Sequence, residues 1–104
     1  MRQRVLEVRQ QEEALEGHRA VVTEVATSIF RGEEMRVNGR VEGNGGGGIS
    51  SAPVMIFLLP AGQTTHSAIQ IGSGWTGSQG LFEVKAHVPE GLTVGRYLVI
   101  ARTL

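Results

Sequence analysis

The sequence predicts an all-β fold: an antiparallel β-sandwich of about seven short strands that follows an irregular N-terminal leader. Three observations lead to this fold class. From residue 19 onward, apolar residues recur with the period of two that marks half-buried strands. Clusters of Gly, Pro, Ser and Asn separate these segments, and such residues favour turns. The chain has 104 residues, of which 40% are hydrophobic, so it is long enough for one domain with a single core.

The leader, residues 1–18, fits two patterns. Val5, Val8 and Leu15 lie roughly at helical spacing, whereas the segment "RVLEVR" alternates like a strand. We expect an irregular or short-strand leader over these residues, followed by one domain over residues 19–104.

Two strands are predicted ahead of the glycine-rich segment. Residues 19–30 are rich in β-branched side chains, which favour strands. Residues 31–34, "RGEE", are typical of a turn. Residues 35–42 alternate between apolar and polar side chains, as a half-buried antiparallel strand does. The apolar face of this second strand is expected to hold Met35, Val37, Gly39 and Val41.

The third predicted strand, residues 54–59, is apolar on both faces. Pro60 ends the segment, so no long helix can form there. A sandwich strand with one face in water would alternate, and "VMIFLL" does not. We expect its second face, formed by Met55, Phe57 and Leu59, to be covered by the leader or by another subunit or domain. The alternative is that the sandwich leaves a few apolar residues exposed.

Three further segments complete the expected sandwich. Residues 66–72 form a weaker strand that leads into the turn-rich segment "SGWTGSQG". Residues 81–88 alternate again, and residues 96–104 form the last strand after the turn "PEGLTVG". The inward-facing residues of the alternating strand are expected to be Phe82, Val84, Ala86 and Val88.

Composition excludes several classes of protein. The net charge is zero and the pI is near 6.8, which argues against binding to nucleic acid or to an anionic membrane. No run approaches about 20 apolar residues, so no segment is predicted to insert into a membrane. The N-terminal residues lack the apolar core and cleavage site of a signal peptide. The absence of Cys and Asp excludes disulfides, thiolate zinc sites and Asp-dependent catalytic triads.

The segment "GNGGGG", residues 43–48, matches the spacing of a dinucleotide-binding loop and nearly matches a phosphate-binding loop. The phosphate loop needs a Lys where this chain has Ile49, and a helix where Pro53 and a strand follow. The dinucleotide loop needs an acidic residue about 20 positions further on, and the next one is Glu83. We interpret the segment as a mobile turn between strands.

The remaining candidates for chemistry are isolated residues. His18, His66 and His87 do not have the spacing of a zinc motif, and no serine lies in a G-x-S-x-G sequence. We therefore expect no enzyme activity, no cofactor and no metal site. Trp75, the only tryptophan, has two interpretations: it packs over the edge of the sandwich, or it is exposed and stacks on a sugar ring.

Several short motifs occur in an order that resembles bacterial and archaeal immunoglobulin-like modules, in particular the repeat-type and macroglobulin-like domains of surface and secreted proteins. The motifs are an aromatic-x-G-E turn, a G-x-V strand, a P-V strand, a T-x3-G-x-F strand and a P-x5-G-x-Y hairpin. Within residues 20–102 they fall on Phe30, Gly32 and Glu33, on Gly39 and Val41, on Pro53 and Val54, on Thr76, Gly80 and Phe82, and on Pro89, Gly95 and Tyr97. Ser78-Gln79 departs from the pattern, which usually has Asp or Asn there.

The resemblance implies an immunoglobulin-like β-sandwich in a modular setting, and it carries over no active site. Tyr97 is similar to a tyrosine corner, in which the hydroxyl bonds to nearby backbone. We expect a non-catalytic structural or protein-interaction module, one domain of a larger cell-envelope or secreted protein outside the cytoplasm. Its partners would be neighbouring domains, another protein, or a second copy through residues 54–59. The expected contact residues are Trp75, Met55, Phe57 and Leu59. The alternative is a carbohydrate-binding module that uses Trp75.

Overall fold

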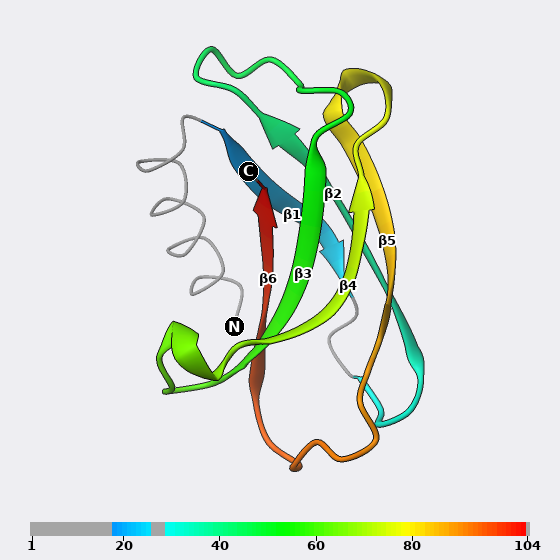
Figure 1. The fold of residues 1–104 in the computed structure, drawn as a ribbon, viewed down its shortest axis with the longest axis vertical. Coiled ribbons are helices and arrows are strands. Elements are labelled where there is room, and N and C mark those ends of the chain that lie inside the picture. Colours follow the sequence, from blue (N-terminus) through cyan, green and yellow to red (C-terminus); the bar gives the residue numbers. More distant parts are fainter. Residues whose placement is uncertain (1–17, 26–28, 104) are drawn as a thin grey trace.

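The computed structural model describes residues 18–25 and 29–103, and predictions made for residues 1–17 lie outside this part. The strands are β1 Arg19–Val25, β2 Glu34–Glu42, β3 Pro53–Pro60, β4 Ile69–Trp75, β5 Leu81–His87 and β6 Tyr97–Thr103. They form two three-stranded antiparallel sheets, with the orders β1–β2–β5 and β4–β3–β6, which face each other (Figure 1). Two short 3₁₀ turns, η1 Thr65–Ser67 and η2 Ser78–Gly80, precede β4 and β5.

The all-β prediction is confirmed, and each of the six strands predicted after the leader is present. The boundaries predicted for the fourth strand are wrong. It begins at Ile69 and not at His66, because a turn occupies the preceding residues, where the Ser67 N–H donates to the Thr64 carbonyl at 2.9 Å. It then continues to Trp75, although the residues around this position are typical of a turn. A seventh strand in the leader would fall on residues that the structure does not describe.

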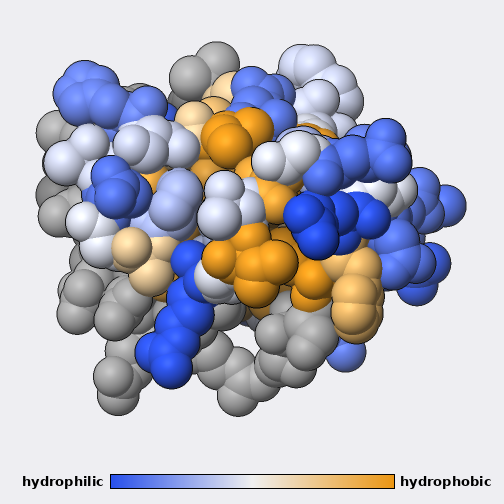
Figure 2. Space-filling view, turned by 90° about the horizontal axis from the view of Figure 1, so that it is seen from below, coloured by the Kyte–Doolittle hydropathy of each residue, from blue (hydrophilic) through white to orange (hydrophobic). Residues whose placement is uncertain are grey.

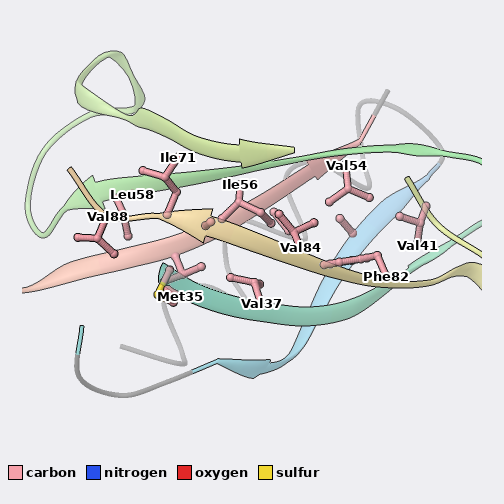
Figure 3. Packing of buried hydrophobic residues seen from close by; sticks show 14 of the residues in the cluster. Met35, Val37, Val41, Val54, Ile56, Leu58, Ile71, Phe82, Val84 and Val88 are labelled. Atoms are coloured by element: carbon pink, nitrogen blue, oxygen red, sulfur yellow. The ribbon is translucent and has the colours of Figure 1, made fainter. Parts of the chain in front are cut away.

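The hydrophobic core lies between the two sheets, and alternate residues of the strands point into it (Figure 3). On β2 and β5 the alternation is regular, as predicted, with the charged side chains on the solvent side. Full burial of one such aliphatic side chain contributes about 1.5–3 kcal/mol, so this layer is the main source of stability. The labelled core residues are Met35, Val37, Val41, Val54, Ile56, Leu58, Ile71, Phe82, Val84 and Val88.

β3 is the middle strand of its sheet, with β4 on one side and β6 on the other. Its inward residues, Val54, Ile56 and Leu58, are fully buried. On the outer face Met55 and Phe57 are half-buried, and Leu59 is buried. The strand therefore has no face fully in water, in agreement with its unbroken apolar sequence. Because both edges of β3 are already paired, a second copy could reach residues 54–59 only through this outer face.

The turn between β1 and β2 has the structure that its sequence predicts. The Glu33 N–H donates to the Phe30 carbonyl at 3.2 Å, and Gly32 has a φ of +78°, a conformation that glycine adopts without strain. The Gly32 N–H also donates to the Val88 carbonyl at 2.8 Å, and the Val88 N–H donates to the Glu33 carbonyl at 2.9 Å. The turn is thus joined to the end of β5.

Residues 43–48 form a turn whose backbone groups bond to one another. The Gly43 N–H donates to the Gly47 carbonyl at 2.9 Å, and the Gly46 N–H donates to the Gly43 carbonyl at 3.0 Å. Strand β3 follows the turn, where a phosphate loop would need a helix. These N–H groups bond to carbonyls and do not converge on an anion site, which agrees with the interpretation as a turn. The predicted mobility of the segment stays a prediction.

Thr76 ties the connection between β2 and β3 to the end of β4. Its buried hydroxyl donates to the Ile49 carbonyl at 2.6 Å and accepts from the Ala52 N–H at 2.8 Å. Its own backbone bonds to the same segment, because the Thr76 N–H donates to the Ala52 carbonyl at 2.9 Å and the Ser51 N–H donates to the Thr76 carbonyl at 3.0 Å. Thr76 therefore has a structural role.

Replacing Thr76 with valine is expected to lower the free energy of unfolding by about 2 kcal/mol, because it leaves the Ile49 carbonyl and the Ala52 N–H without their partner. Urea denaturation measures this change. The control is Thr76→Ser, which keeps the hydroxyl and should keep most of the stability. Equal stability of Thr76→Val and the wild type would show that these two hydrogen bonds are not needed.

Tyr97 lies at the start of β6, and its hydroxyl donates to the Thr93 carbonyl at 2.5 Å. This hydrogen bond is similar to that of a tyrosine corner, in which the hydroxyl bonds to backbone a few residues upstream. The hydroxyl is therefore used within the domain.

Candidate functional site

The four predicted contact residues lie on one surface, the outer face of the β4–β3–β6 sheet. Trp75 pairs with Pro53 at one end of this face, and Met55 lies between Ser73 on β4 and Arg102 on β6. Further along, Phe57 pairs with Ile100 and Leu59 pairs with Leu98. Directly paired residues of antiparallel strands point to the same side of a sheet, so these side chains share the outer face.

Trp75 is the most exposed large side chain on this face, with 70% of its surface accessible. It ends an edge strand, so one side of the indole has no neighbouring strand. The interpretation that Trp75 packs over the edge of the sandwich is therefore wrong, and the interpretation as an exposed ring agrees with the structure. An exposed indole offers a flat apolar surface and one N–H donor, which suit either a protein side chain or a sugar ring.

Arg102 belongs to this site and was not predicted. Its guanidinium carbon lies 5.2 Å from the centre of the Phe57 ring, within the range of a cation–π contact. Arg102 is also the only charged residue on the three strands of this sheet. The sequence could have indicated it only through the pairing of β3 with β6, which brings together residues 45 positions apart.

The far end of the same face is buried. Leu59, Leu98 and Ile100 form a second hydrophobic cluster, separate from the core, and Phe57 and Ala68 pack against it. We call these five residues the outer cluster. The face thus changes along its length, from an exposed tryptophan at one end to buried aliphatic side chains at the other. The predicted covering of this face by the leader concerns residues outside the described part.

Glu42 is the one buried charged residue in the described ranges, and two arginines bind it. Arg19 donates to one carboxylate oxygen through Nε at 3.1 Å and through Nη2 at 2.9 Å, and Arg40 pairs with the other oxygen. Both oxygens are therefore occupied by cations from the same sheet. This arrangement joins β1 to β2 beside the glycine-rich turn and leaves no oxygen free to act on a substrate.

The end of the molecule that carries the β1–β2 and β5–β6 connections has apolar surface at its centre (Figure 2). Phe30 and Val94, which lie in these two connections, are exposed. The Arg31 Nη1 donates a hydrogen bond to the Leu92 carbonyl at 3.4 Å, which joins the two connections. A hollow of about 460 Å³ opens at the start of β2. The carboxylates that line it, those of Glu24, Glu33 and Glu34, are exposed to solvent. The hollow is lined by Glu24, Val25, Ile29, Phe30, Glu33, Glu34, Met35, Arg36, Asn38 and Val88.

The described part of the chain brings together no group of three His, Cys, Asp or Glu side chains that could hold a metal ion. Within the same residues, no helix is long and apolar enough to cross a bilayer. Comparisons with models of known protein families, with curated protein sequences and with solved structures found no match. The function is therefore inferred from the geometry of the outer face.

Proposed function

We propose that this chain is a non-catalytic structural or protein-interaction module, an immunoglobulin-like domain of a larger cell-envelope or secreted protein. The observation that carries the proposal is one end of the outer face, where the exposed Trp75, Met55 and the Phe57–Arg102 pair lie on the same face of one sheet. This surface would contact a neighbouring domain of the same polypeptide or another protein.

The order of the strands supports the immunoglobulin-like assignment. In such sandwiches strands A, B and E share one sheet, and strands C and F pair in the other. Here β1, β2 and β5 correspond to A, B and E, while β3 and β6 correspond to C and F, with β4 beside β3 as in the variable type. The tyrosine corner of these domains lies near the start of strand F, and Tyr97 starts β6.

The composition of the exposed end supports a protein partner. Tryptophan, arginine and methionine are enriched in protein interfaces, and tryptophan and arginine are the most frequent residues at energetic hot spots. No carboxylate lies on β3, β4 or β6. A partner would therefore offer an apolar surface that receives the indole.

A photo-crosslinking residue placed at Ser73 tests the proposal. Ser73 is exposed and lies on the outer face beside Met55. In an extract of the source organism we expect discrete protein adducts. These adducts should be absent when the protein with the crosslinker at Ser73 also carries the Trp75→Ala substitution. The control position is Lys85, which is exposed on the outer face of the other sheet. The same adducts from both positions, or adducts that persist with Trp75→Ala, would contradict the proposed surface.

The alternative function, carbohydrate binding, is favoured by the exposure of Trp75, because a sugar ring stacks on an open aromatic face. Ser73 and Gln70 on the same strand are exposed and could bond to hydroxyl groups. Fluorescence distinguishes the two functions, since Trp75 is the only tryptophan. For the interaction module we expect no change in emission across a panel of glycans. Saturable quenching that is lost in Trp75→Ala would establish the carbohydrate function instead.

A further inference from the structure

Both asparagines of the chain are followed by glycine, at Asn38-Gly39 and at Asn44-Gly45. In such a pair the backbone nitrogen of the glycine can attack the side-chain amide carbon of the asparagine, because glycine has no Cβ that obstructs the approach. The two pairs share this chemistry but lie in different structures. Asn38-Gly39 belongs to β2, the middle strand of its sheet, whereas Asn44-Gly45 belongs to the turn of residues 43–48.

The turn leaves Asn44 and Gly45 open to this reaction. Both residues are exposed to solvent. The two backbone hydrogen bonds of the turn join Gly43 to Gly46 and to Gly47, and neither involves the residues between them. Within the described ranges, no hydrogen bond uses the Gly45 N–H. An added Cβ at Gly45 would meet no atom within 4 Å, so no packed neighbour restricts the backbone there.

β2 protects the other pair. Gly39 pairs with Val22 on β1 and with Phe82 on β5, so strands on both sides hold its backbone in the extended form. The attack requires the glycine nitrogen to turn toward the preceding side chain, and an extended strand does not allow this rotation. The Asn38 side-chain nitrogen also donates to Glu24 Oε1 at 3.5 Å.

The two side-chain oxygens differ as well. The attack turns the amide oxygen into an oxyanion before ammonia leaves, and an oxyanion is stabilised by hydrogen-bond donors or by water. The Asn38 Oδ1 is buried, and the described part of the chain offers it no hydrogen-bond donor. Reaction there would place a charge where nothing stabilises it, which is costly. Asn44 is exposed, so water reaches its amide.

We propose that Asn44 is a site of spontaneous covalent modification, at which it converts to aspartate and isoaspartate while Asn38 stays intact. The Gly45 nitrogen loses its proton to solvent and bonds to the side-chain carbon Cγ of Asn44. The bond from Cγ to Nδ2 breaks, and the amide nitrogen takes a proton from water and leaves as ammonia. One water molecule then opens the cyclic imide at either carbonyl, which gives aspartate or isoaspartate.

The product changes the charge and the backbone of the turn. The chain has no aspartate and a formal net charge of zero, so each conversion adds one negative charge. The new carboxylate lies close in the sequence to Glu42, whose oxygens are bonded to Arg19 and Arg40. In the isoaspartate the backbone runs through the former side chain and is longer. Modified and unmodified protein therefore separate by ion exchange.

Incubation of the folded protein in mildly alkaline buffer tests the proposal. Digestion with a protease that cleaves before aspartate then reports the reaction, because the unmodified chain has no aspartate. We expect cleavage before position 44, and peptide mapping should find isoaspartate at the same position. Conversion at Asn44 should exceed that at Asn38 by at least about tenfold, because Asn38 reacts only when β2 opens. Equal conversion at both positions, or none at Asn44, would overturn the proposal.

The same incubation in urea separates the effect of structure from that of sequence. In the unfolded chain both asparagines precede a flexible glycine, so we expect similar rates at the two positions. The rate at Asn38 should rise by at least about tenfold over that in the folded protein, and the rate at Asn44 should change much less. A large rise at Asn44 would mean that the turn protects it, and an unchanged rate at Asn38 would mean that β2 does not. Either result would contradict the proposal.

Gly45→Ala tests the attacking nitrogen. It should slow conversion of Asn44 by about tenfold or more, because a Cβ beside the nitrogen obstructs the approach. The matched control is Gly47→Ala in the same turn, where the residue is also exposed and an added Cβ would meet no atom within 4 Å. Gly47 does not follow an asparagine, so this variant should react like the wild type. Equal rates in the two variants would overturn the proposal. Neither variant alters Trp75, so the proposed function is tested separately.

Discussion

Replacing Gly39 with alanine is expected to lower the free energy of unfolding by about 3 kcal/mol or more. Gly39 lies in the middle strand of the first sheet, directly opposite Phe82. A Cβ at this position would lie 2.1 Å from the Val21 carbonyl oxygen and 2.5 Å from the Phe82 ring. The ring could rotate, but the carbonyl belongs to the backbone of β1. The added methyl group would therefore force β1 and β2 apart. Such a backbone shift costs more free energy than the rotation of a side chain.

Urea denaturation measures this loss, and Gly45→Ala is the control. An added Cβ at Gly45 would meet no atom within 4 Å, and its φ needs no glycine. The control should be neutral, or stabilising by up to about 1 kcal/mol, because alanine restricts the unfolded chain. If Gly39→Ala unfolds at the same urea concentration as Gly45→Ala, the close approach of β1 to Gly39 does not exist in solution.

Gly80→Ala is the second change with a large expected effect, again about 3 kcal/mol, because two costs add. Gly80 has a φ of +76°, where an L-residue loses about 1–2 kcal/mol. A Cβ would also lie 2.6 Å from the Val41 carbonyl oxygen, 2.7 Å from the Ile49 nitrogen and 2.9 Å from the Gly48 Cα. The Gly48 Cα belongs to the turn of residues 43–48, and the Ile49 N–H that follows this turn donates to the Val41 carbonyl of β2. The substitution should therefore displace that turn.

Gly46→Ala separates the two costs. Gly46 has a similar φ, +85°, but an added Cβ would meet no atom within 4 Å. It should lose only the conformational part, about 1 kcal/mol. The predicted order of stability is therefore wild type, then Gly46→Ala, then Gly80→Ala, as read from urea midpoints. An equal loss for the two variants would mean that the contact of Gly80 with the turn contributes nothing.

The strands could be predicted because their signal is local. A period of two over residues 35–42 or 81–88 requires burial of one face, and both strands formed with those inward residues. The unbroken apolar run of residues 54–59 likewise indicated a strand without a fully wet face. The error at β4 has a local cause as well, since a 3₁₀ turn competes for the residues before Ile69.

The site could be predicted only in part, because it depends on the register between strands. Trp75, Met55 and Phe57 were expected to make contacts, but their common face follows from the pairing of β3 with β4. Arg102 was missed because its partner, the Phe57 ring, lies on a strand distant in the sequence. The role of Thr76 was missed for the same reason, since hydrogen bonds across a connection leave no periodic signal.

β1 begins and β6 finishes at the same end of the molecule, beside the glycine-rich turn. Arg19 pairs with Glu42, where β2 ends, and Thr103 pairs with Val54, where β3 begins. Polypeptide attached at these two points would leave the domain side by side. A pulling force between Arg19 and Thr103 would load the hydrogen bonds of β1 and β6 one after another, starting from the end at which each strand is pulled. The domain should therefore resist tension weakly along this direction, since its antiparallel hydrogen bonds would not be sheared together.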